Sequence, residues 1–178
     1  SRFDEPAIAI RARAYAALAE ALSRDQGWLE LEQTWELAVK ADLPEHAGMI
    51  GFLACWAAAT HRDLDRADHL LADVVPYCLD QDLMLFLSYS RGASALAMLH
   101  RGQWCKAAAT ATTILADPGP LPINRLAPLV VLGLTQARRG KAGAWPLPPE
   151  SISMDHLADR YPFGLAWEAW AEATWLAG

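Results

Sequence analysis

The sequence predicts an all-α fold in which helices pack in successive pairs, an α-α superhelix. Three observations lead to this prediction. Apolar residues recur three and four positions apart over most of the chain, and alanine is abundant. No stretch alternates apolar and polar residues as a half-buried strand would. A similar helix-turn pattern also returns at near-constant intervals, so we expect one helical repeat domain over residues 1–178.

Turn-forming residues divide most of the chain into helices. The clearest breaks are the Asp25-Gln26-Gly27 stretch, the Leu43-Pro44 step and the Asp117-Pro118-Gly119-Pro120 turn. Around these breaks, helices are expected over residues 3–22, 28–41, 45–60, 64–79, 82–100, 104–116 and 123–138. Pro128 is expected to bend the last of these helices, and Gly140 to cap it.

The remaining part of the chain is rich in proline. Pro146, Pro148 and Pro149 predict an irregular connection over residues 141–150. A short helix is expected over residues 150–159. Pro162 then introduces a final helix that reaches about Leu176.

The repeat is clearest where one helix turns into the next. The segments ending at Ala67 and Ala107 each follow a His-Arg dipeptide closely, and their positions differ by 107 − 67 = 40. Trp28 precedes Ala67 by a similar interval, 67 − 28 = 39, and Trp145 follows Ala107 by 145 − 107 = 38. Four such units predict a tetratricopeptide-like solenoid of about four helix pairs plus a terminal helix. Its period exceeds the usual value of about 34 residues.

Small residues recur on the first helix of each expected pair. Twelve residues before the turn position, these helices carry Cys55, Ala95 and Gly133. Small side chains allow close approach of helices, so we expect the two helices of a pair to cross there.

Composition excludes several classes of function. The formal net charge of −6 makes nucleic-acid binding by this chain unexpected, because phosphate contacts need cationic surface. No apolar run reaches the roughly 18–20 residues of a membrane span. The three cysteines are an odd number without Cys-x-x-Cys spacing, which favours free thiols in a reducing compartment, the cytoplasm.

Residue types that carry catalysis or bind metals do not form a known pattern. His61 and His69 lie near Asp63, Asp65 and Asp68, but this spacing matches no metal-ligand motif. Carboxylate pairs such as Glu30 with Glu32 fit the solvated face of an amphipathic helix. The sequence also lacks a nucleophile elbow and a phosphate-binding loop. We therefore expect no catalytic centre, no cofactor and no bound metal.

The best candidate site is a groove. In stacked helix pairs the first helix of each pair lines the concave face. The repeat register places there Arg13, Phe52, Trp56, Tyr89, Leu96 and Arg138. Aromatic side chains mixed with arginine are typical of a groove that binds a peptide or a small ligand. The alternative is that these side chains pack between adjacent pairs.

Five stretches carry a resemblance to a known family: residues 29–48, 66–83, 100–119, 125–140 and 171–178. They resemble the C-terminal helical region of multidomain bacterial signalling ATPases of the STAND type. Many of those proteins carry a LuxR-type helix-turn-helix or a nucleotide-cyclase domain. The resemblance implies a regulatory repeat module that senses a signal, oligomerises or holds the ATPase in check. After Trp145 the sequence departs from the acidic, leucine-rich helix of that family, so the fourth pair is expected to be deformed or opened.

These observations predict a non-catalytic regulatory module. Its expected partner is a protein, another domain of its parent chain or a small-molecule inducer, and a homodimer is a further arrangement. The chain begins at Ser1 and ends within the apolar pattern TWLAG, so we expect a fragment of a larger protein. The alternatives are a free-standing tetratricopeptide adaptor or scaffold, and an enzyme with its active site inside a helical bundle.

Overall fold

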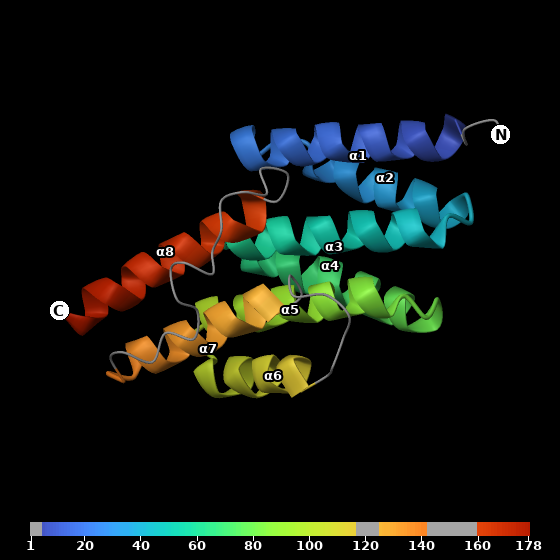
Figure 1. Ribbon diagram of the computed structural model, residues 1–178. Coiled ribbons are helices and arrows are strands. Elements are labelled where there is room, and N and C mark those ends of the chain that lie inside the picture. The colour runs from blue at the N-terminus through green and yellow to red at the C-terminus, as the bar shows by residue number, and fades with distance from the viewer. Residues whose placement is uncertain (1–4, 117–124, 142–159) are drawn as a thin grey trace. The chain divides into compact units, whose positions relative to one another are not determined.

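The computed structural model describes residues 5–116, 125–141 and 160–178. Over these residues it contains helices and no strand, so the predicted all-α fold is confirmed. The helices are α1 (Glu5–Arg24), α2 (Trp28–Lys40), α3 (Pro44–Thr60), α4 (Leu64–Asp80), α5 (Met84–His100), α6 (Trp104–Ala116), α7 (Leu126–Arg138) and α8 (Arg160–Ala177) (Figure 1). None of these described helices is long and apolar enough to cross a membrane.

Two prolines occupy different positions in their helices. Because α7 begins at Leu126, Pro128 lies in its first turn, where a missing N–H costs no helical hydrogen bond. A proline in the first turn does not bend a helix, so the bend expected at Pro128 has no physical cause in α7. Pro76, by contrast, lies inside α4, where the hydrogen bond to the Ala72 carbonyl is lost. Both residues are exposed, so water can satisfy that carbonyl.

Several sequence predictions fall outside the described residues. They concern the turn at residues 117–120, the connection that follows Lys141, the short helix over residues 150–159, and Trp145. The partner helix expected to complete a fourth pair with α7 falls in the same part of the chain.

The corners within helix pairs repeat the same backbone geometry. Two N–H groups at each corner bond back to carbonyls three and five residues earlier: Arg62 to Ala59 and Asp63 to Ala58, Gly102 to Leu99 and Gln103 to Met98, Gly140 to Ala137 and Lys141 to Gln136. The first residue of each set has positive φ, 61° at Arg62, 75° at Gly102 and 74° at Gly140. The intervals in residue number are 102 − 62 = 40 and 140 − 102 = 38, as the sequence predicted.

The corners between pairs are also alike. Asp42 and Asp82 have φ of 56° and 54°, a conformation that aspartate tolerates better than most residues. The next N–H groups, of Leu43 and Leu83, bond to carbonyls five residues earlier at 3.1 and 2.8 Å. The interval between the two aspartates is again 82 − 42 = 40 in residue number. The second and third pairs therefore share one register along their whole length.

The first pair departs from that register. Its corner uses Asp25 and Gly27, with φ of 54° and 84°, and α2 begins directly after Gly27. Trp28 consequently matches Leu64, the first residue of α4, and the first interval in residue number is 64 − 28 = 36. The predicted alignment of Trp28 with Ala67 is therefore wrong by three residues.

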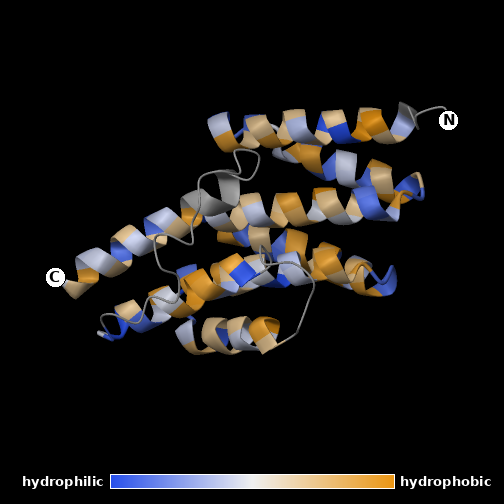
Figure 2. Cartoon of the chain, viewed as in Figure 1, coloured by the Kyte–Doolittle hydropathy of each residue, from blue (hydrophilic) through white to orange (hydrophobic). Residues whose placement is uncertain are grey.

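The chain forms two compact units, Ser1–Ala97 and Met98–Gly178. In the first unit α2 packs against α1 and α3, and α3 also packs against α1 and α4; in the second unit α7 packs against α6 and α8. The six residues from Ala54 to Ala59 are all buried, so every face of the second half of α3 is covered. Figure 2 shows the hydrophobic colouring along most of α3. The expectation of a single domain stays a prediction.

Two glycines of α3 allow this burial. A Cβ atom at Gly51 would lie 2.8 Å from Val74 of α4 and 2.9 Å from the indole nitrogen of Trp35 of α2. A Cβ atom at Gly48 would lie 2.6 Å from Phe86 of α5. Real Cβ atoms do not approach that closely, so glycine is required for the observed spacing of these helices.

Arg66 ties α4 to α2. Its guanidinium lies 4.7 Å above the ring of Trp28 and 3.5 Å from the Glu32 carboxylate. Within α4 it donates to Asp63 at 2.8 Å, and Asp63 also caps the helix by accepting the Arg66 N–H at 3.2 Å. The guanidinium holds the pKa of the Asp63 carboxyl below its ordinary value.

Replacing Asp63 with alanine is expected to lower the free energy of unfolding by about 1 kcal/mol at neutral pH, because α4 loses its cap. The depressed pKa means that this stabilisation is complete above the ordinary aspartate pKa and is lost as pH falls through the lower folded-state value. Urea unfolding should therefore show a constant deficit from neutral pH down to about pH 4, the ordinary aspartate value, and a shrinking deficit below it. Asp73→Ala, on the exposed face of α4, is the control. A pH-independent deficit would contradict this role.

Substituting leucine for Ala107 is expected to cost about 1–3 kcal/mol, because this residue is fully buried at the start of α6 and the added atoms must displace neighbours. Ala109→Leu, on the exposed face of the same helix, should be close to neutral. Thermal unfolding of both variants measures the difference. Equal melting temperatures would count against the repeat register.

Candidate functional site

A row of large side chains crosses three helices of the first unit. Helices α1 and α3 and the first-unit part of α5 run in the same direction (Figure 1). Tyr15 of α1, Met49 and Phe52 of α3, and Tyr89 of α5 meet across them. We call these four residues the apolar stripe.

The stripe contains two short contacts, one at each end. The Tyr15 hydroxyl donates to the Met49 sulfur at 3.6 Å. The rings of Phe52 and Tyr89 stack with centroids 4.5 Å apart and planes inclined by 24°. Met49 and Phe52 are three residues apart on α3, which places them on the same face. The two contacts therefore lie next to each other along one face of α3.

The stripe is partly open to solvent. Tyr15 is 47% exposed, and Met49, Phe52 and Tyr89 are half-buried. A single exposed aromatic side chain is ordinary, but four adjoining large side chains on successive first helices form a patch. Patches of this kind mark places where proteins bind partners.

Two of the predicted groove residues are interior instead. Trp56 is only 4% exposed and Leu96 is fully buried, so the prediction that they line an open groove is wrong. Each follows a small residue, Cys55 or Ala95, and precedes a buried alanine. Short neighbours allow the backbone of adjacent elements to come close, which covers the large side chain between them. The indole N–H of Trp56 has no hydrogen-bond partner among the described residues.

Arg13 does not join the stripe. It forms an ion pair with Glu30 of α2, which raises the pKa of Arg13 and lowers that of Glu30. Arg13 and Tyr15 are two residues apart and therefore about 200° apart around the helix axis. Arg13 consequently faces α2, whereas Tyr15 faces α3.

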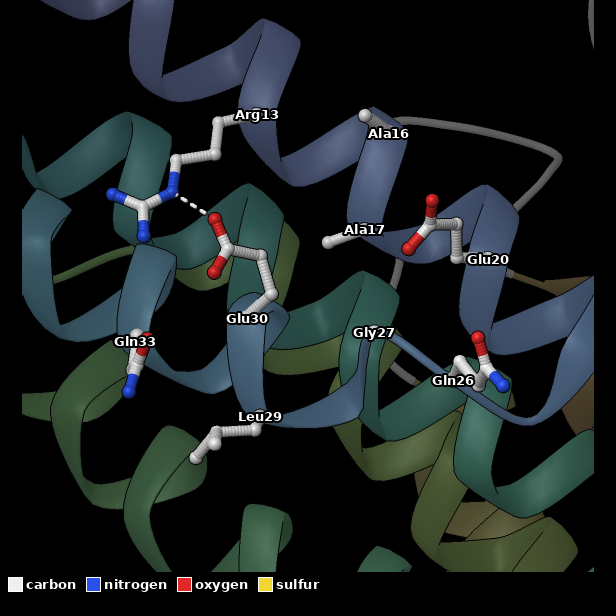
Figure 3. Close-up of a pocket in the computed structure, with 9 residues that line it drawn as sticks. All are labelled: Arg13, Ala16, Ala17, Glu20, Gln26, Gly27, Leu29, Glu30 and Gln33. Carbon is white, nitrogen blue, oxygen red and sulfur yellow. Dashed lines mark hydrogen bonds and ion pairs between the residues drawn. The ribbon is translucent and has the colours of Figure 1, made fainter.

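The Arg13–Glu30 pair lies in an open depression of about 560 Å³ between α1 and α2 (Figure 3). Ala16, Ala17 and Gly27 are also part of its lining, together with Glu20, Gln26, Leu29 and Gln33. The guanidinium of Arg13, the one cation of this lining, is already paired with the Glu30 carboxylate. The lining contains no serine, cysteine, lysine or histidine.

Arg138 belongs to the second unit. There it donates two hydrogen bonds to the Glu172 carboxylate of α8, at 2.6 and 2.9 Å. This paired geometry is the strong form of an arginine–carboxylate contact and fixes α8 against α7. Arg138 thus has a structural role in the second unit.

Two of the three cysteines are enclosed by the fold, and the third is exposed. Cys55 and Cys78 are buried, and burial raises the pKa of both thiols, that of Cys78 to about 11. Neither thiol is therefore a nucleophile at neutral pH. Cys105 is exposed and accepts a hydrogen bond from Arg139 at 3.2 Å. Among the residues that the structure describes, no three His, Cys, Asp or Glu side chains gather as metal ligands would.

The repeat register identified half of the stripe. Phe52 and Tyr89 were predicted from it, whereas Tyr15 and Met49 were not. A signal for Tyr15 is present in the sequence, because Ile8 precedes it by two helical turns and places a second large apolar side chain on the same face. For Met49 the signal is its spacing of three residues from Phe52.

The chain matches no model of a known protein family, no curated protein and no solved structure. The apolar stripe is therefore the observation on which a functional proposal can be built.

Trp56→Ala is expected to lower the free energy of unfolding by about 3–5 kcal/mol, because removing a buried indole leaves a cavity. Tyr15→Ala, on the exposed part of the stripe, should cost about 1 kcal/mol or less. Chemical denaturation of the two variants gives the comparison. If both variants are equally stable, Trp56 is not a core residue and the distinction between core and stripe fails.

Proposed function

We propose that this chain is a non-catalytic regulatory module that binds a protein segment through the apolar stripe. The observation that carries the proposal is the row of large, partly exposed side chains from Tyr15 to Tyr89 on three successive first helices. A core would bury such side chains fully, and a purely solvated face would carry polar residues instead. Binding of a partner is the function that such a surface can perform.

We place the module in a multidomain bacterial regulator, of the STAND ATPase or LuxR type, in the cytoplasm. The sequence resemblance described above supports this context. The partner is then another domain of the parent chain or a separate protein, with a small-molecule inducer or a second copy of the chain as further candidates. The net charge of −6 argues against nucleic acid as the partner of this module.

Site-specific photo-cross-linking tests the proposal. A benzophenone amino acid is introduced at Tyr15, 47% exposed, or as a matched control at Leu79 of α4, 51% exposed. Irradiation in cells that make the protein should give a discrete cross-linked partner from position 15 only. Adding Phe52→Ser should abolish that product, because Phe52 lies on the same surface.

Two results would overturn the proposal. One is equal cross-linking from both positions, which would indicate non-specific collision with exposed apolar surface. The other is a product from position 15 that persists when Phe52 is replaced. Circular dichroism of each variant shows whether the helical fold is retained.

A further inference from the structure

We infer that the partner segment is an amphipathic α-helix that lays an uncharged apolar face on the stripe. This inference rests on the proposed function and specifies the conformation and charge of what is bound. Three properties of the stripe lead to it: its poor hydrogen-bonding capacity, its neutrality and its width.

Hydrogen bonding decides between a helix and an extended peptide. The strong hydrogen-bonding groups of the four side chains are the hydroxyls of Tyr15 and Tyr89, and that of Tyr15 already donates to the Met49 sulfur. The stripe residues lie within helices, whose backbone groups bond to one another. An extended peptide would bury more N–H and C=O groups against this surface than two hydroxyls can pair with, at a cost for each unpaired group. A helix satisfies its backbone internally and avoids that cost.

Charge decides the composition of the contacting face. All four stripe residues are uncharged. Two exposed charged residues border the stripe, Arg11 one turn before Tyr15 on α1 and Glu45 one turn before Met49 on α3. A charged group on the partner that lay over the four stripe residues themselves would lose its hydration without a counter-ion in that surface. The complementary face is therefore apolar over the stripe, and charge belongs at its edge.

The dimensions agree with a short helix. Packed helices lie about 8–10 Å apart, so a stripe that crosses α1, α3 and α5 spans about 20 Å. A helix rises about 1.5 Å per residue, so about 14 residues cover this distance. Methionine between the aromatic rings adapts readily to the ridges of a packed helix.

A displayed library of random peptides of about 16 residues tests the inference. Peptides are selected on the whole chain and depleted on the Phe52→Ser/Tyr89→Ser variant, so that the survivors require the stripe. We expect the surviving sequences to carry apolar residues at positions i, i+3, i+4 and i+7, with few charges among them. A synthetic survivor should become helical on binding by circular dichroism. Tyr15→Ser should weaken its binding about tenfold or more, and Leu79→Ser less than about twofold.

Three outcomes would overturn the inference. They are survivors with alternating apolar residues, survivors dominated by charged residues, or no survivors after depletion. Melting curves verify that the double variant is folded; if it is not, Tyr15→Ser, at an exposed position, replaces it for depletion. Cross-linking from position 15 together with extended or charged survivors would leave the proposed function intact and reject only the helix. Absence of both the cross-link and the survivors would reject the proposed function as well.

Discussion

The close packing of α3 is the constraint on which the first unit depends. Gly48 and Gly51 leave no room for a Cβ atom, and the second half of the helix is buried on every side. Because α3 has no side-chain bulk at these two positions, α2, α4 and α5 can all approach it. Interiors at this density do not absorb added atoms, so the spacing of those helices is fixed by two missing side chains.

Neighbouring turns of α3 differ in how far their aromatic side chains are exposed. Phe52 remains half-buried and stacks on Tyr89, whereas Trp56, one turn later, is enclosed. Trp56 lies within the run from Ala54 to Ala59, in which every residue is buried, whereas Phe52 precedes that run. The stripe therefore ends where the alanine-rich half of α3 begins.

Local chemistry made much of the fold predictable. The corners at Asp42, Asp82, Gly102 and Gly140 follow from residue types that accept positive φ, and the repeat interval could be read directly from them. The first pair was misaligned because the aromatic residue after a glycine suggested the wrong equivalence. In the structure Gly27 caps α2 directly, which shifts the register by three residues. Sequence patterns predict helices and corners well, but they do not measure how tightly two helices approach.

The candidate site was predictable only in part for the same reason. The register correctly grouped Phe52 with Tyr89, yet it treated Trp56 and Leu96 as equivalent to them. Whether a residue on that face is open or covered depends on the volumes of its neighbours on other helices. Arg13 and Arg138 illustrate a second gap, since their ion-pair partners, Glu30 and Glu172, come from different helices and no spacing rule selects them.

The recurrence of the corners has a consequence for how the chain folds. Within each unit the helix contacts connect elements one or two places apart in the chain. Forming them requires closure of short loops only, so little chain entropy must be lost before contacts begin to stabilise the structure. Proteins with such local contacts fold rapidly, and folding of stacked pairs can start at any corner and spread to its neighbours. For the first unit, the α3–α4 corner is a natural starting point, because α3 has packing partners on both sides in the chain.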